Sequence, residues 1–132
     1  GTLYGDMAGG LSVIGDVYKT DVYKLARYIN REQEIIPERI MRKSPSAELK
    51  PDQLDTDSLP EYQILDSILY QYIELQKPAD EISMEGFDRS VVDRVLRLIN
   101  YNEYKRYQAP PVLRISSKSF GDGRKMPIVA KY

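Results

Sequence analysis

Neither cysteine nor histidine occurs anywhere in the 132 residues of this chain. Their absence excludes disulfides, thiolate nucleophiles and imidazole acid–base catalysis, and it removes the usual ligands of zinc. The sequence also lacks any run of about 18 apolar residues, the length that indicates a membrane-spanning helix. We therefore expect a soluble protein with no membrane partner, in a reducing environment such as the cytoplasm.

An excess of charge of either sign is missing as well. Lysine and arginine number 19 against 20 for aspartate and glutamate, which gives a net charge of -1. This balance offers no general attraction to nucleic acids, so any anion-binding site has to be local. Hydrophobic residues make up 42% of the chain, which suffices for one unit with a modest core.

Apolar residues at spacings of three and four predict three long helices, over about residues 17–33, 60–76 and 89–107. Asp16 is the expected N-cap of the first helix. Residues 77–87 leave room for at most one helical turn, because glycine and proline interrupt them. Further features expected from the pattern are a glycine-rich loop over residues 1–16, a proline-started turn over 35–40, an extended segment over 112–116 and a basic tail after it.

Residues 42–62 separate two of the helical patterns and combine adjacent cations, Arg42 and Lys43, with hydroxyl residues and prolines. Long connections without regular structure are often binding loops or lids. The composition suits a loop that meets an anionic ligand, and it suits a solvated linker equally well.

Three further polar positions each allow two interpretations. Lys19 falls in the first turn of a predicted helix, where a cation opposes the helix dipole unless an anion binds there, but it can also be a plain exposed lysine. Asp6 lies between glycines and either faces a ligand or bonds its own backbone in a turn. Lys105 and Arg106 lie near the end of the third helix, where helix capping alone would explain them.

Three separated segments resemble, in the same order, the C-terminal portion of the long, glutamine-dependent form of NAD⁺ synthetase. They are residues 2–11 followed by Lys19, residues 43–49 (Lys-Ser-Pro-Ser-Ala-Glu-Leu) and residues 103–106 (Glu-Tyr-Lys-Arg). Residues 121–128 also resemble the terminus of that family. The resemblance covers nearly the whole chain, and no single motif carries it.

The resemblance implies an ATP-dependent ligase of the ATP-pyrophosphatase type. Such an enzyme adenylates the carboxylate of nicotinate adenine dinucleotide (deamido-NAD⁺), releases pyrophosphate, and lets ammonia from glutamine displace AMP to give NAD⁺. The implied fold is a doubly wound α/β, adenine nucleotide hydrolase-like domain, of which residues 1–132 would be a mostly α fragment with little strand. Mg²⁺ would be held mainly by residues outside this chain.

The resemblance also assigns site residues. Lys19 and Ser46, and more weakly Lys43, would contact ATP. Lys105, with Tyr104 before it, would contact deamido-NAD⁺, and Asp6 is placed with them. Tyr104 stands where the short, ammonia-dependent enzymes carry histidine.

Several parts of the family pattern are missing from the sequence. They are the phosphate loop (Ser-Gly-Gly-x-Asp-Ser), the magnesium-binding acid and the N-terminal glutaminase domain. We therefore expect a fragment that is inactive alone and associates with the remainder of the synthetase or with a second copy. The segment 44–58 is expected to be mobile without nucleotide. The alternative is an independent helical module that binds a protein partner and no nucleotide.

Overall fold

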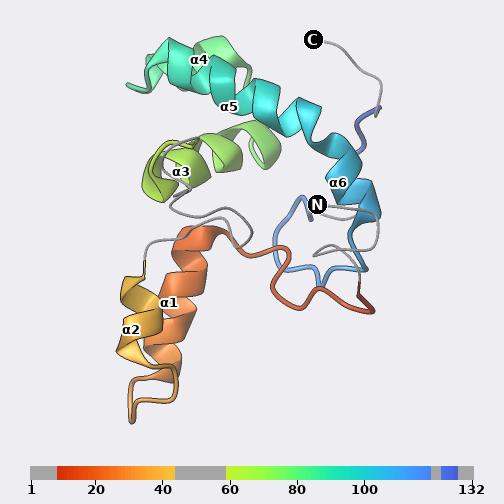
Figure 1. Ribbon diagram of the computed structural model, residues 1–132. Helices are drawn as coiled ribbons and strands as arrows, with labels where there is room; N and C mark the ends of the chain where they lie inside the picture. Colours follow the sequence, from red (N-terminus) through yellow and green to blue (C-terminus); the bar gives the residue numbers. More distant parts are fainter. Residues whose placement is uncertain (1–8, 44–58, 120–122, 128–132) are drawn as a thin grey trace, which may run out of the picture. The chain divides into compact units, whose positions relative to one another are not determined.

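The computed structural model describes residues 9–43, 59–119 and 123–127 (Figure 1). These residues are mostly helical, as expected, and their only β pairing is an isolated bridge between Ser12 and Val112. None of the helices found in them has the length and apolar character to cross a membrane. The six helices are α1 (Lys19–Ile29), α2 (Glu38–Arg42), α3 (Tyr62–Ile73), α4 (Ala79–Met84), α5 (Arg89–Tyr101) and α6 (Glu103–Gln108).

The chain divides into two compact units where the sequence predicted one. The first, called here the arm unit, consists of Gly1–Val17 and Ser67–Tyr132, and the second, the α1–α2 unit, consists of Tyr18–Asp66. The prediction of one unit rested on composition, which does not show which parts of a chain contain the buried residues. The arm unit contains all four fully buried large side chains of the described residues, namely Ile68, Ile82, Val92 and Val95.

In the arm unit, α4 packs against α5 and α6 follows directly after α5. Helix α5 begins where the sequence predicted, because Asp88 caps it by accepting hydrogen bonds from the backbone N–H groups of Ser90 (2.8 Å) and Val91 (3.3 Å). The Ser90 hydroxyl also donates to this carboxylate. That bond first, and the two N–H bonds after it, hold the pKa of Asp88 below its usual value.

Two predictions about this unit were wrong in detail. The helix expected over 89–107 breaks at Asn102, whose side-chain amide donates to the carbonyl of Leu98 (2.8 Å). Asparagine competes with regular helix through such local bonds. Helix α4 has six residues instead of at most one turn. Its Ile82 is fully buried, and tertiary packing of this kind stabilises a helix beyond its local propensity.

The α1–α2 unit corrects a third prediction, the cap of the first helix. Asp16 does not cap α1; its carboxylate bonds the backbone of residues 115–116 instead. The N-cap position is Tyr18, without a side-chain cap. The free N–H of Thr20 donates to the Asp66 carboxylate at 2.8 Å, so a residue distant in sequence supplies the cap.

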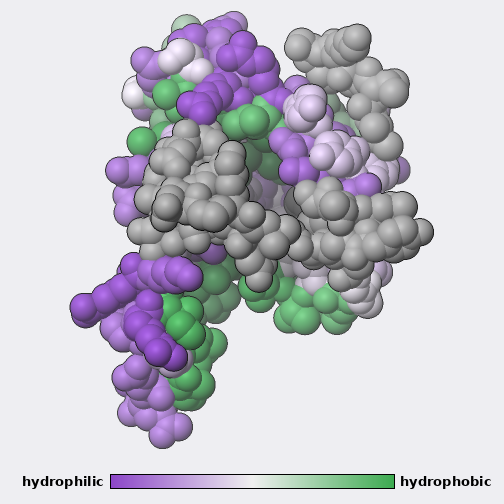
Figure 2. All heavy atoms as spheres, viewed as in Figure 1, coloured by the Kyte–Doolittle hydropathy of each residue, from purple (hydrophilic) through white to green (hydrophobic). Residues whose placement is uncertain are grey.

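Asn30 joins α1 to α2. Its side-chain oxygen accepts from the N–H groups of Ile35 (3.0 Å) and Ile36 (2.9 Å), and its amide donates to the Ile36 carbonyl (2.8 Å). The turn expected after Pro37 is a short helix of five residues. Neither α1 nor α2 buries a residue. Figure 2 shows apolar side chains along one side of this helix pair and hydrophilic ones along the other.

Candidate functional site

Lys19 is the first residue of α1, so the structure confirms its place in the first turn. Its ammonium nitrogen lies 5.7 Å from the ring centroid of Tyr23 and 5.8 Å from that of Tyr62. Both rings belong to the same unit and hold the cation by cation–π attraction. Lys19 therefore presents a positive charge that lies close to two aromatic rings.

The N-terminal end of α1 is less suited to binding an anion than the sequence predicted. The Asp66 carboxylate, which is 8% exposed, already accepts the N–H of Thr20. A phosphate would have to share this helix end with a buried carboxylate, so the anion attraction there rests on the Lys19 side chain. Lys43 caps the C-terminal end of α2 and is exposed, in the same unit as Lys19.

Tyr104 and Lys105 lie next to each other in the first turn of α6. The Tyr104 ring is 38% exposed, and the Lys105 ammonium lies 6.0 Å from its centroid. Because α6 begins anew at Glu103, these two residues belong to the start of a separate short helix. A ring with a cation beside it suits a ligand that combines an aromatic base with phosphate or carboxylate.

Glu103, one residue before this pair, is only 4% exposed and is the ionic centre of the arm unit. Its Oε1 accepts from Arg106, with the Nε bond at 2.9 Å, and its Oε2 lies 4.0 Å from an Arg124 nitrogen. The two arginine side chains are 9% and 13% exposed. Removing one member of a buried ionic cluster leaves the others uncompensated, so Glu103 fixes α6 against the C-terminal residues.

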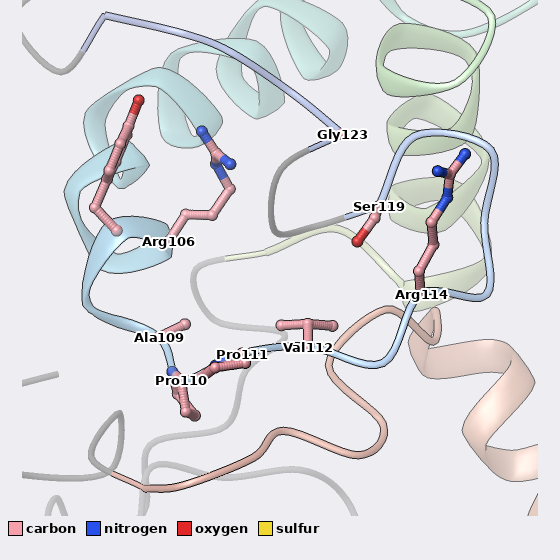
Figure 3. Close-up of a pocket in the computed structure, with 9 residues that line it drawn as sticks. Arg106, Ala109, Pro110, Pro111, Val112, Arg114, Ser119 and Gly123 are labelled. Carbon is pink, nitrogen blue, oxygen red and sulfur yellow. The ribbon is translucent and has the colours of Figure 1, made fainter.

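A pocket of about 600 Å³ lies beside α6 in the arm unit (Figure 3). Arg106 reaches it from α6, while Arg114 and Ser119 come from the segment after it. Both cations already have protein partners, since Arg114 donates to the carbonyls of Ser116 (3.2 Å) and Ser117 (2.9 Å). The volume matches small-molecule sites, which measure about 300–1,000 Å³.

The structure brings together only part of the predicted site. Tyr104 and Lys105 are neighbours in the arm unit, whereas Lys19 and Lys43 belong to the α1–α2 unit. Their convergence on one pair of substrates stays a prediction. Asp6, Ser46 and the segment 44–58 lie outside the described residues.

The sequence did not predict the roles of Asp16, Glu103 and Arg124. Glu103 stands inside the Glu-Tyr-Lys-Arg motif, so a buried partner for Arg106 three residues away was open to inference from helical spacing. The contacts of Asp16 and Arg124 cross long stretches of sequence, and no local pattern predicts them.

The described residues contain no cluster of three or more aspartate, glutamate, cysteine or histidine side chains that would hold a metal ion. The Mg²⁺ implied by the resemblance therefore finds no fitting site among them.

Comparisons with known proteins agree with the resemblance read from the sequence. The family model described as NAD synthase matches residues 1–109. Glutamine-dependent NAD⁺ synthetase of Acinetobacter baylyi is 55% identical over 130 residues, and that of Synechocystis is 50% identical over 131 residues. The alignments include 97% and 99% of this chain.

A solved structure gives the same result. The glutamine-dependent NAD⁺ synthetase of Acinetobacter baumannii, in complex with adenosine diphosphate, is 45% identical and superposes with a TM-score of 0.54 over 98% of this chain. The alignments take in only 24% of the first two relatives and 22% of the solved chain. The chain thus spans about a quarter of the length of the curated relatives it matches.

Proposed function

Because this chain belongs to the NAD synthase family, we propose that it forms part of the ammonia-ligase domain of a glutamine-dependent NAD⁺ synthetase. The observation that carries the proposal is 55% identity over nearly the whole chain to a relative of that name. The independent interaction module is not favoured, since it gives no reason for such a match. The complete domain would be the doubly wound α/β fold, to which these helices contribute.

The proposed reaction has two steps. A carboxylate oxygen of deamido-NAD⁺ bonds to the α-phosphorus of ATP as pyrophosphate leaves. Ammonia then attacks the activated carbonyl carbon, AMP departs, and a proton is lost to leave the amide of NAD⁺. Negative charge develops on the leaving oxygens in both steps, and positioned cations and hydroxyls stabilise it.

In this proposal Lys19, Ser46 and Lys43 serve ATP. Lys19 carries its charge at the start of α1, and the rings of Tyr23 and Tyr62 restrict its side chain. A cation held in this way loses less conformational entropy when it binds a phosphate.

Lys105, Tyr104 and Asp6 serve deamido-NAD⁺ in the same proposal. The dinucleotide carries two phosphates and a nicotinate carboxylate, so an ammonium on α6 complements its charge. The partly exposed Tyr104 ring offers a face to an aromatic base. The remainder of the synthetase, the glutaminase domain and a second copy are the proposed partners.

The test uses the full-length protein that carries this chain, assayed for NAD⁺ formation from ATP, deamido-NAD⁺ and ammonium. Replacing Lys105 with alanine is expected to raise the KM for deamido-NAD⁺ about tenfold and to leave the KM for ATP within about twofold. Lys24→Ala is the matched control, since Lys24 is 72% exposed and forms only a surface pair with Asp21.

The 132-residue chain alone is expected to form no NAD⁺. Absence of NAD⁺ formation by the full-length protein would refute the proposal. Calorimetric measurement of ATP binding tests the assignment of the ATP contacts separately. If Lys19→Ala and Ser46→Ala bind ATP as tightly as the unmodified protein does, the assignment of the ATP contacts is wrong.

A further inference from the structure

Residues 112–127, called here the C-terminal arm, bond through their described residues to residues 9–16 and to α6, which carries Tyr104 and Lys105 of the proposed dinucleotide site. Residues 9–16 are the described part of the glycine-rich loop before α1. The arm follows the part of the chain matched by the family model, which ends at residue 109. The family model therefore does not include the arm residues that make these contacts.

On the loop side, Asp16 makes the main contact. Its Oδ2 accepts the N–H groups of Ile115 and Ser116, both at 2.7 Å, and its Oδ1 accepts the Ser116 hydroxyl at 3.0 Å. Hydrogen bonds to an ionised carboxylate are roughly twice as strong as neutral ones. One side chain thus binds a segment about 100 residues away in the sequence.

A short parallel bridge reinforces this contact. The N–H of Ser12 donates to the carbonyl of Pro111 (2.8 Å), and the N–H of Leu113 donates to the carbonyl of Ser12 (3.4 Å). The loop approaches the arm so closely at Gly15 that a Cβ there would lie 2.5 Å from the Ser12 hydroxyl oxygen and 3.2 Å from a Val112 methyl carbon. A side chain at this position would therefore require the Ser12 hydroxyl to rotate and the Val112 side chain to shift.

On the helix side, Arg124 makes the main contact. It pairs with Glu103 of α6 at 4.0 Å, donates to the Asn100 side-chain oxygen of α5 at 3.3 Å, and stacks 5.3 Å from the Tyr72 ring centroid. The Tyr107 hydroxyl donates to the carbonyl of Met126 at 3.0 Å. The arm is thus fastened to α6 and to the glycine-rich loop.

We propose that the C-terminal arm is a brace that joins residues 9–16 to α6, and that Asp16 is a positioning residue for the proposed dinucleotide contacts on α6. This rests on the proposed function. Residues 9–16 contain three glycines and form no helix or named strand, so their position depends on contacts with other segments. Small displacements of binding groups cost large factors in rate. The start of α1 is held separately, by Asp66, so the brace acts on the dinucleotide more than on ATP.

The test measures ammonia-dependent NAD⁺ formation by the full-length protein carrying Asp16→Ala. The KM for deamido-NAD⁺ is expected to rise about tenfold, while kcat and the KM for ATP stay within about twofold. Asp16→Asn keeps an acceptor oxygen for the two N–H groups, so it should recover most of the loss. Asp80→Asn is the charge-matched control, because Asp80 is 75% exposed in a surface pair with Arg89.

Amide hydrogen exchange on the same proteins separates the brace from the proposed function. Asp16→Ala should speed exchange at Ile115, Ser116 and Ser12, and Asp80→Asn should not. Unchanged exchange at these amides overturns the brace whatever the kinetics show. Faster exchange with equal rises in both KM values, or with a fall in kcat alone, overturns the positioning role. Failure of the unmodified protein to form NAD⁺ refutes the proposed function, and the brace is then decided by exchange.

Discussion

The helix pairs α1–α2 and α5–α6 are built in similar ways and buried very differently. Helices α1 and α5 are both amphipathic and similar in length, with 11 and 13 residues. Each pair has an asparagine at its joint, Asn30 in one and Asn102 in the other. Yet α1 and α2 bury no residue, whereas α5 buries Val92 and Val95, and α6 buries Glu103.

The difference shows that amphipathic periodicity fixes where a helix forms but not what covers it. In α5–α6 the apolar stripe lies against α4, and the arm supplies ionic partners. In α1–α2 the order comes from local contacts: the Asn30 bonds and the surface pairs Lys24–Asp21 and Arg42–Glu38. Surface pairs of this kind contribute little, about 0–1 kcal/mol each.

The largest effect is expected from the buried ionic cluster. Glu103→Ala removes the carboxylate between Arg106 and Arg124, which leaves two largely buried guanidinium groups without this negative charge beside them. We expect α6 and the arm to lose about 3–5 kcal/mol of local opening free energy, measured by hydrogen exchange in the full-length protein. Glu81→Ala, an exposed position on α4, is the control. Equal protection of α6 in both variants would show that the cluster does not stabilise it.

An intermediate effect is expected at the joint of the other pair. Asn30→Ala removes three hydrogen bonds to the backbone of residues 35–36, each contributing about 0.5–1.5 kcal/mol. Because α2 has no buried residue, its position depends on these bonds, and we expect exchange to accelerate over residues 35–42 but not within α5. Asn30→Asp keeps the two accepted bonds and should retain most of the protection. Acceleration that spreads to α5 would contradict a local role.

The sequence predicted the helices well because apolar periodicity is a local property. The apolar spacing alone placed the start of α5 correctly. The predictions that failed depended on distant residues. Asp16 has the right side chain and position to cap α1, but it binds the arm, and Asp66 takes its place. The helix break at Asn102 is caused by a local hydrogen bond. Asparagine also occurs within unbroken helices, however, so its presence alone does not predict a break.

In the candidate site, too, the features that depend on local sequence were predicted and those that depend on distant residues were not. The sequence singled out Lys19 from its position in a first turn, and Tyr104 with Lys105 from a motif, and the structure places all three in the first turns of helices. Their supports were beyond reach of the sequence. The rings around Lys19 come from α1 and α3. The contacts of the arm with α6 join Met126 to Tyr107 and Arg124 to Glu103, which are distant in the sequence.

The smallest effect is expected on the apolar side of α1. Leu25 lies on the predicted stripe but is 46% exposed, so Leu25→Ser should change the local opening free energy of α1 in the 132-residue chain by less than about 0.5 kcal/mol. Val95→Ala in α5, which removes two buried methyl groups, is the matched comparison and should cost about 1.5–3 kcal/mol. The same pair is then measured in the full-length protein. If Leu25→Ser there costs as much as Val95→Ala, the stripe is covered in the full-length protein, and the contrast between the two helix pairs belongs to this chain alone. If Leu25→Ser stays neutral, α1 is exposed in both, and its periodicity reflects no buried interface.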